Sequence, residues 1–340
     1  MDNLTHTLAG IALAQAGLKR KTRFAMLALI VASNLPDIDI VTAAGGSLTY
    51  LKFHRGITHS LIGLTVLAAA LAFILYIPGL RAAPKKGAPP LSLKWLFFVC
   101  WAGTALHVLM DFTNSYGIRP FLPFSGRWYA LDIMPIIGPW LLLFLLLGLC
   151  VPAVLRLASE EVGAKKGRSP AARNGAIFAL CAMVALWGLR SVSHQRALGL
   201  LSARMYGEEN AAGLGAFPHA LNPFEWTGVA ETEDAYTLLD VDALAPNLSL
   251  EDVGALHKPE SSPALSVAQR TAAVKMFLNF ARFPYAVVFD QEDNHRVFMR
   301  DLRFASPDSK RWNFVLEIDL NKSLRVIRQT FTFRMPEPVH

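Results

Sequence analysis

The sequence predicts a polytopic α-helical membrane domain of about four to six membrane helices, followed by a smaller α+β domain with an antiparallel sheet. Three observations support this. The chain is 53% hydrophobic and only 17% charged, the basic residues of its first 200 positions gather in three short segments, and shorter strand-like segments replace the long apolar runs from about residue 200. We therefore expect a helical membrane domain over residues 1–198 and a second domain over residues 199–340.

Long apolar runs define the first domain. They cover roughly residues 4–18, 24–35, 57–77, 95–112, 134–155 and 174–190. Because a membrane helix needs about 20 apolar residues, the last four runs are good candidates for full spans. The two N-terminal runs are short, which predicts either a helical hairpin packed inside the bundle or two interfacial helices.

The distribution of Lys and Arg predicts the orientation. The connecting segments 19–23, 81–94 and 156–173 hold thirteen of the nineteen basic residues found before residue 200. Positively charged loops stay in the cytoplasm. If all six runs cross the membrane, these three loops share the cytoplasmic face, and the N-terminus and everything after residue 195 lie on the other face.

The charge balance also bears on partners. Nineteen basic and seven acidic side chains give the first 200 residues a net charge of +12, whereas fourteen basic and nineteen acidic side chains give the rest −5. The excess of basic residues thus belongs to the membrane loops, and no phosphate-binding loop or DNA-binding motif is present, so we expect no nucleic-acid partner. The three cysteines all lie inside apolar runs, which favours buried thiols over a disulfide framework.

The second domain is predicted from shorter segments. Residues 236–242, 285–290, 295–305, 311–320 and 323–333 are β-branched and aromatic-rich and are separated by turn residues, which is typical of strands. Residues 266–283 have helical spacing and stop before Pro284. By the topology above, this module lies outside the cytoplasm.

Acidic residues are scarce in the first domain, and four of its seven carboxylates stand beside histidines in short, breaker-rich segments. In the predicted topology, eight such side chains fall at the membrane face opposite the basic loops: His6, Asp37, Asp39, His54, His59, His107, Asp111 and Asp132. Carboxylates in an apolar chain are unfavourable unless they are paired, metal-bound or wetted by a cavity. Imidazoles and carboxylates together form a ligand set for Zn, Mn or Mg.

The spacing of these residues supports a shared site. His107 and Asp111 are four residues apart, so on a helix they project from one face. Asp37 and Asp39 follow Pro36, where the preceding apolar run must end. A His–Asp hydrogen bond within the bundle, or a cap or turn role for an aspartate, would explain the same residues without a metal.

The segment 54–60 places His54 and His59 beside Arg55 at the start of a helix. Arginine is a planar donor suited to phosphate or carboxylate, and a helix N-terminus also favours anions. Arg55 is therefore a candidate for holding an anionic part of a substrate. His6 and Asp132 have simpler alternatives as a helix cap and a surface ion-pair partner.

Four motifs together resemble one family. They are T-H-T at residues 5–7, N-L-P-D-x-D at 34–39, H-R-G-x-T-H-S at 54–60 and H-x-x-x-D-x-x-N-x-Y-G at 107–117. In this order they resemble the YdjM-like family of bacterial inner-membrane proteins, whose type member is LexA-regulated and which are regarded as metal-dependent hydrolases. The resemblance covers about residues 1–200, and the C-terminal module resembles the one carried by longer members. It implies a location in the bacterial inner membrane, a hydrolase, and these metal ligands: His6, Asp37, Asp39, His54, His59, His107 and Asp111.

From the residues and the resemblance together, we expect hydrolysis of an ester or phosphoester in a membrane lipid or another small envelope metabolite. One or two divalent ions, Zn before Mn or Mg, would activate a water molecule, and Asp37, Asp39 or Asp132 would act as general base. The alternatives are a transporter or metal-handling protein that uses the same residues, and a non-catalytic membrane scaffold. Runs 61–77 and 134–155 contain no charged residue, which disfavours transport. The sequence leaves the oligomeric state open.

The predicted topology can be tested with reporter fusions. We expect alkaline phosphatase fused after residue 340 to be active and green fluorescent protein at the same position to be dark, because residues after 195 should lie outside the cytoplasm. Fusions within the basic segment 81–94 serve as the control and should give the opposite pattern. A fluorescent fusion at residue 340 would contradict both the topology and the gathering of the eight side chains at one face.

Overall fold

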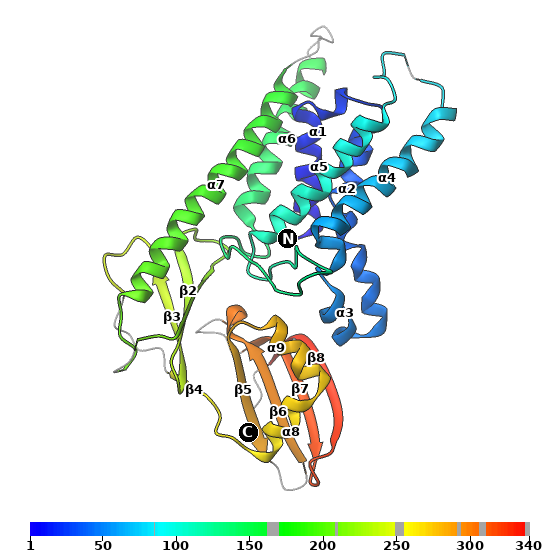
Figure 1. Ribbon diagram of the computed structural model, residues 1–340. Coiled ribbons are helices and arrows are strands. Elements are labelled where there is room, and N and C mark those ends of the chain that lie inside the picture. The colour runs from blue at the N-terminus through cyan, green and yellow to red at the C-terminus, as the bar shows by residue number, and fades with distance from the viewer. Residues whose placement is uncertain are drawn as a thin grey trace. The chain divides into compact units, whose positions relative to one another are not determined.

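The computed structural model describes residues 1–84, 86–161, 170–207, 210–248, 255–290, 294–305 and 311–336 (Figure 1). It divides into two compact units, one of residues 1–39 and 55–190 and one of residues 40–54 and 191–340. The sequence placed a single boundary at 198/199 and did not anticipate that residues 40–54 join the second unit. The topology prediction uses some residues that lie outside the described ones. These are four basic loop residues, Lys85, Lys165, Lys166 and Arg168, and the C-terminal His340.

Each of the six apolar runs forms a helix. The helices are α1 (Asn3–Ala16), α2 (Ala25–Ala32), α4 (Leu61–Arg81), α5 (Leu93–Phe112), α6 (Pro139–Glu161) and α7 (Ala171–Ser202). Ser60 and Ser92 begin α4 and α5 as N-caps, since each hydroxyl accepts a backbone N–H one turn into the helix. The predicted helical domain is confirmed.

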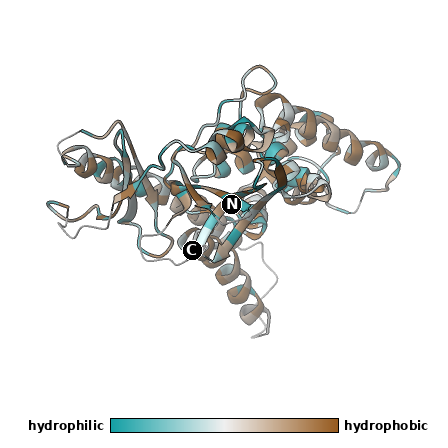
Figure 2. Cartoon of the chain, turned by 90° about the horizontal axis from the view of Figure 1, so that it is seen from below, coloured by the Kyte–Doolittle hydropathy of each residue, from teal (hydrophilic) through white to brown (hydrophobic). Residues whose placement is uncertain are grey.

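Within the described residues, five segments are long and apolar enough to cross a membrane: Ala25–Gly45, Leu61–Arg81, Leu93–Phe112, Pro139–Ala158 and Ala171–Ser202. Figure 2 shows brown, the hydrophobic colour, on much of the helical ribbon. Large apolar side chains point outward from them, with Ile74 65% exposed and Val184 60% exposed, as suits a lipid-facing surface. Helix α1 has only 14 residues and packs against α2, α5 and α6, with Ala9 and Ala12 fully buried.

Glycines allow the helices of the first unit to pack closely. A Cβ atom at Gly10 of α1 would lie 2.8 Å from the carbonyl oxygen of Leu29 in α2, and one at Gly103 of α5 would lie 2.7 Å from the Cβ of Ala32. Small residues at such crossings let backbones approach each other in a membrane bundle. These contacts hold α1 against α2 and the end of α2 against α5.

The second unit contains two antiparallel four-stranded sheets. The first has the order β1 (Gly213–Pro218), β2 (Glu225–Glu231), β3 (Ala235–Asp242), β4 (Ala255–His257). The second has the order β5 (Pro284–Asp290), β6 (Asn294–Asp301), β7 (Arg311–Asn321), β8 (Val326–Pro336). Ala197 and Leu201 at the end of α7 pack on the first sheet beside the buried Trp226. The antiparallel α+β character is confirmed, with two sheets where the sequence indicated one.

Three short helices accompany the second sheet. Helices α8 (Pro263–Arg270) and α9 (Ala272–Phe280) pack against β6 and β7, and α3 (Ser47–Phe53) packs against α9 and β8. The helical segment expected at 266–283 is divided between α8 and α9 because Thr271 leaves the helical conformation, with ψ 150°. Its hydroxyl then accepts the N–H of Val274 and caps α9.

The close packing of α2 on α5 makes a prediction about stability. Gly103→Val should destabilise the protein by about 1–3 kcal/mol, because the added atoms have no space beside Ala32. Thermal unfolding in detergent measures this. Gly188→Val on α7 is the control, since nothing lies within 4 Å of a Cβ atom at Gly188. Equal melting temperatures for the two variants would show that the α2–α5 contact is not tightly packed.

Candidate metal centre

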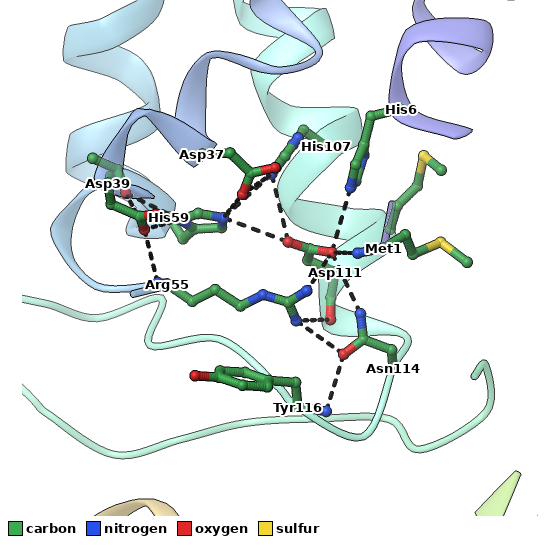
Figure 3. A network of polar contacts seen from close by, with 12 residues as sticks. Met1, His6, Asp37, Asp39, Arg55, His59, His107, Asp111, Asn114 and Tyr116 are labelled. Atoms are coloured by element: carbon green, nitrogen blue, oxygen red, sulfur yellow. Dashed lines mark hydrogen bonds and ion pairs between the residues drawn. The ribbon is translucent and has the colours of Figure 1, made fainter. Parts of the chain in front are cut away.

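The predicted ligands of the first unit come from the ends of its helices (Figure 3). Asp37 and Asp39 lie on a 3-10 stretch, Leu35–Gly45, that follows α2 after Pro36. His59 ends a short 3-10 turn, Ile57–His59, directly before α4. His107 and Asp111 occupy the last two turns of α5. The interruptions of helical structure at Pro36 and Gly56 therefore direct polar residues inward at the point where apolar helices end.

Four donor atoms face one another in this cluster, which we call the metal centre: Asp37 Oδ1, His59 Nε2, His107 Nε2 and Asp111 Oδ2. They all lie within 4.8 Å of one another and could hold a metal ion. The two imidazole nitrogens are 3.2 Å apart. Each lies 3.5 Å from the Asp37 oxygen and 3.4–3.5 Å from the Asp111 oxygen.

These separations fit a tetrahedral ion. Zinc–nitrogen and zinc–oxygen bonds of about 2.0–2.2 Å imply donor–donor distances of about 3.3–3.6 Å at tetrahedral angles. Five of the six distances in the cluster are between 3.2 and 3.5 Å. In addition, Asp111 Oδ2 is buried and has no hydrogen-bond partner. A buried carboxylate oxygen without a donor is unfavourable, and a cation at the centre of the four atoms would satisfy it.

In both histidines of the metal centre, a contact to the Nδ1 atom orients the ring. Nδ1 of His107 lies 2.7 Å from the carbonyl oxygen of Ser33 and must donate to it, because a carbonyl only accepts. Nδ1 of His59 lies 3.4 Å from Asp39 Oδ2. In each case the Nε2 atom is left to face the cluster, which is the usual arrangement for a histidine that binds a metal.

Burial alone would lower the pKa of His59. Its contacts with Asp111, Asp37 and Asp39 outweigh burial and raise the pKa to about 10 in the metal-free protein. A metal ion would have to displace this proton, so binding should release it.

The side chain of Arg55 contacts the end of α5 and the turn that follows it. It is buried, with φ 50°, a left-handed conformation uncommon for residues other than glycine. Its guanidinium donates to Asp111 Oδ1 and to Asn114 Oδ1, each at 2.9 Å, and lies 4.8 Å from the ring centre of Tyr116. Its backbone N–H donates to Asp39 Oδ2 at 2.8 Å. Arg55 therefore positions Asp111 of the metal centre and Asp39 beside it, while its expected role in holding an anion stays a prediction.

His6 lies on the other side of Asp111. Its ring stacks on His107 at 3.8 Å between centroids, and its Nε2 is 3.5 Å from Asp111 Oδ1. Both ring nitrogens are buried and have no hydrogen-bond partner. The terminal ammonium group of Met1 forms an ion pair with the same Asp111 oxygen. The imidazole of His6 is thus near the four donors without being one of them.

The other two predicted residues, Asp132 and His54, are not among the four donors of the metal centre. Asp132 is buried with φ 57°, on a segment held to the end of α5 by hydrogen bonds from the backbone N–H groups of Leu131 and Ile133. Among the described residues, its carboxylate is not one of the four clustered donors. His54 belongs to the second unit, where its ring stacks on Tyr50 at 4.4 Å.

Sequence reasoning missed three residues that support the cluster. They are Ser33, which acts through its carbonyl oxygen, Thr58, whose hydroxyl donates to Asp39 at 3.1 Å, and Tyr116 under Arg55. A backbone acceptor leaves no signal in the sequence. Thr58 and Tyr116 do lie within the motifs at 54–60 and 107–117, and this position is the signal that could have identified them.

The fold and the cluster define a multi-pass membrane protein with a buried His/Asp centre. The sequence profile of the YdjM inner membrane protein family matches residues 1–197, more than half of the chain, so this protein belongs to that family. The profile of the YfhP C-terminal alpha/beta plait domain matches residues 263–335.

A relative from Bacillus subtilis (strain 168), described as the uncharacterized protein YfhP, is 31% identical over 149 residues. The matched region covers 42% of this chain and 43% of that relative, which is less than half of either protein. No solved structure matches the chain.

The metal centre predicts the metal content of the purified protein. Wild-type protein should retain a divalent ion, and His107→Ala should lose most of it because a ligand is removed. Asp39→Asn should weaken affinity by about 10- to 100-fold, since it weakens the support of His59. Elemental analysis and a competition titration with a chelating dye measure both effects.

His295→Ala provides the matched control, because His295 pairs with Asp290 in the second unit. Its metal content should equal that of the wild type. Full metal occupancy in His107→Ala would show that the four donors do not hold the ion.

Proposed function

We propose that this protein is a membrane-bound, metal-dependent hydrolase that cleaves an ester or phosphoester at the extracytoplasmic face. The observation that carries the proposal is the four-donor cluster of nitrogen and oxygen atoms at near-tetrahedral separations. Structural zinc sites are rich in cysteine. Among the described residues, the metal centre contains no sulfur donor, which favours a site that does chemistry over one that only holds the fold.

Three of the four donors, those of His59, His107 and Asp111, would be the ligands of a bound ion, with zinc as the preferred metal. The fourth, the more exposed Asp37, would leave one coordination position open to water. Such an ion lowers the pKa of a bound water molecule and polarises a carbonyl or phosphoryl oxygen. The protein's part is to fix the three ligands. Ser33 and Asp39 hold the two imidazoles, and Arg55 holds the Asp111 carboxylate through the 2.9 Å contact to Oδ1, leaving Oδ2 for the ion.

Asp37 is the residue we assign as general base. Its side chain is 16% exposed, whereas those of His59, His107 and Asp111 are 0–1% exposed. A water molecule or substrate can therefore reach Asp37 first. Asp39 is less suited to this role because it already accepts hydrogen bonds from Arg55 and Thr58. In this arrangement Asp37 accepts the proton of the attacking water.

The location of the ligands favours a substrate at the membrane surface. His107 and Asp111 lie in the last turns of a candidate span, and His59 lies directly before another. Side chains at helix ends meet the headgroup region of a bilayer, where the ester and phosphoester bonds of lipids are found. The basic loops expected at the opposite ends of the helices support the extracytoplasmic side for these ligands.

A transporter or metal-handling protein is the alternative. Such a protein needs polar groups along the depth of the membrane. The donors His59, His107 and Asp111 are instead gathered at helix ends. Metal uptake by proteoliposomes that contain the protein, in the absence of any hydrolysis, would favour transport.

The proposal predicts a chelator-sensitive activity. In a screen of phosphoester and carboxylester substrates, detergent-purified protein should turn over at least one compound, and metal removal should abolish turnover. Asp37→Asn should retain the metal and lose about 100-fold or more in turnover, because only the proton acceptor is removed. His59→Ala should lose both metal and activity.

Two results would overturn these assignments. Loss of the metal in Asp37→Asn would make Asp37 a ligand and not the base. Turnover that survives both substitutions and chelation would exclude the metal centre as the active site.

A further inference from the structure

An apolar groove lies in the second unit, whereas the metal centre belongs to the first. It has a volume of about 560 Å³ and is lined by Ile40, Ala43, Ser47, Tyr50 and Phe333. This volume lies within the range of about 300–1,000 Å³ that is usual for small-molecule pockets. The lining offers no charged group, so the groove suits a hydrocarbon and gives a polar ligand little to bind.

The walls of the groove come from three elements. Ile40 and Ala43 belong to the 3-10 stretch, Ser47 and Tyr50 to α3, and Phe333 to β8. Helix α3 packs against β8, and the rings of Tyr50 and Phe333 meet edge to face at 5.7 Å. The stack of His54 on Tyr50 at 4.4 Å holds the second side of that ring. The groove is thus a formed feature of the unit.

The position of the groove residues in the chain indicates that an occupant of the groove would come from the membrane. Ile40 and Ala43 lie within the candidate membrane span Ala25–Gly45, so two of the five lining residues belong to a segment apolar enough to meet lipid. Apolar side chains next to the groove in sequence are exposed, with Val41 at 67% and Phe53 at 48%. An exposed apolar surface that continues from a membrane segment favours lipid over a soluble partner.

The chain itself connects this groove to the metal centre. Ile40 is bonded to Asp39, which orients His59, and His54 is bonded to Arg55, which holds Asp111. The groove segment 40–54 is therefore joined at both ends to residues that support the metal ligands. A ligand that changes the conformation of this segment would act on their support directly.

We propose that the groove binds an acyl chain of a membrane lipid, and that an acyl-chain lipid is the substrate class of the metal centre. The second part rests on the proposed function, whereas the first part does not. Each methylene group that the groove buries should strengthen binding up to about fourfold, which corresponds to about 0.8 kcal/mol per CH₂. Long-chain substrates should therefore bind more tightly than short-chain ones.

Photo-crosslinking of the full-length protein tests the first part. The protein is reconstituted in phosphatidylethanolamine–phosphatidylglycerol vesicles that contain a phospholipid with a diazirine in its acyl chain, and labelled peptides are mapped by mass spectrometry. We expect label on residues 40–50 and at Phe333. Ala43→Trp, which fills the groove, should remove most of this label, and Tyr50→Ala should reduce it by emptying one wall.

Val41→Trp is the matched control, because Val41 is exposed and does not line the groove. Its labelling should equal that of the wild type. Label confined to the membrane helices, or label unchanged by Ala43→Trp and Tyr50→Ala, would overturn the proposal. An unlabelled groove in a chain that runs as a dimer would identify a second copy as the occupant and would overturn it as well.

Hydrolysis provides the second readout. The ratio of long-chain to short-chain ester turnover should fall in Ala43→Trp and stay at the wild-type value in Val41→Trp. If no substrate is hydrolysed but the groove is labelled, the proposed function fails and the lipid site stands. If hydrolysis occurs with no preference for long chains and without labelling, the groove proposal fails and the metal hydrolase stands.

Discussion

The first unit depends on the carboxylate of Asp111, which is 1% exposed at the end of an apolar helix. A buried carboxylate requires opposite charge and hydrogen-bond donors. Its Oδ1 accepts a hydrogen bond from the Arg55 guanidinium at 2.9 Å, and its Oδ2 lies 3.4–3.5 Å from the Nε2 atoms of His59 and His107. Because these partners come from α5 and from the segment before α4, Asp111 joins the ends of separate helices. The same contacts leave Oδ2 directed at the place where a cation fits.

The cluster also explains the irregular backbone around it. A regular helix through residues 33–39 or 55–60 would continue the apolar bundle and could not turn a carboxylate and an imidazole toward α5. Helix α2 ends at Ala32, ahead of Pro36, and Arg55 has a left-handed conformation in the segment before α4. Strained or irregular segments of this kind are stabilised by the contacts they make possible. Fold and site therefore share the same residues.

Much of this could be predicted because membrane proteins obey simple rules. Apolar runs of sufficient length gave the helices, and scarce carboxylates beside histidines identified the residues that meet, among them His59 and His107. Three features escaped prediction for physical reasons. Residues 40–54 pack with the second unit through long-range contacts such as that of Tyr50 with Phe333. Asp132 has a left-handed conformation, on a segment whose neighbouring residues hydrogen-bond to the end of α5, and no motif in the sequence indicates this. The apolar spacing of residues 266–283 predicts one helix, but Thr271 caps α9 and so divides the segment into α8 and α9.

X-ray absorption spectroscopy of the metal-loaded, detergent-purified protein tests the central claim most directly, because it reports the atoms bound to the ion. The donor set of His59, His107 and Asp111 predicts for zinc a first shell of about four nitrogen and oxygen atoms at roughly 2.0–2.1 Å, with the outer-shell scattering of two imidazole rings. A first shell containing sulfur at about 2.3 Å, or one without imidazole scattering, would contradict the assignment of this cluster as the metal centre.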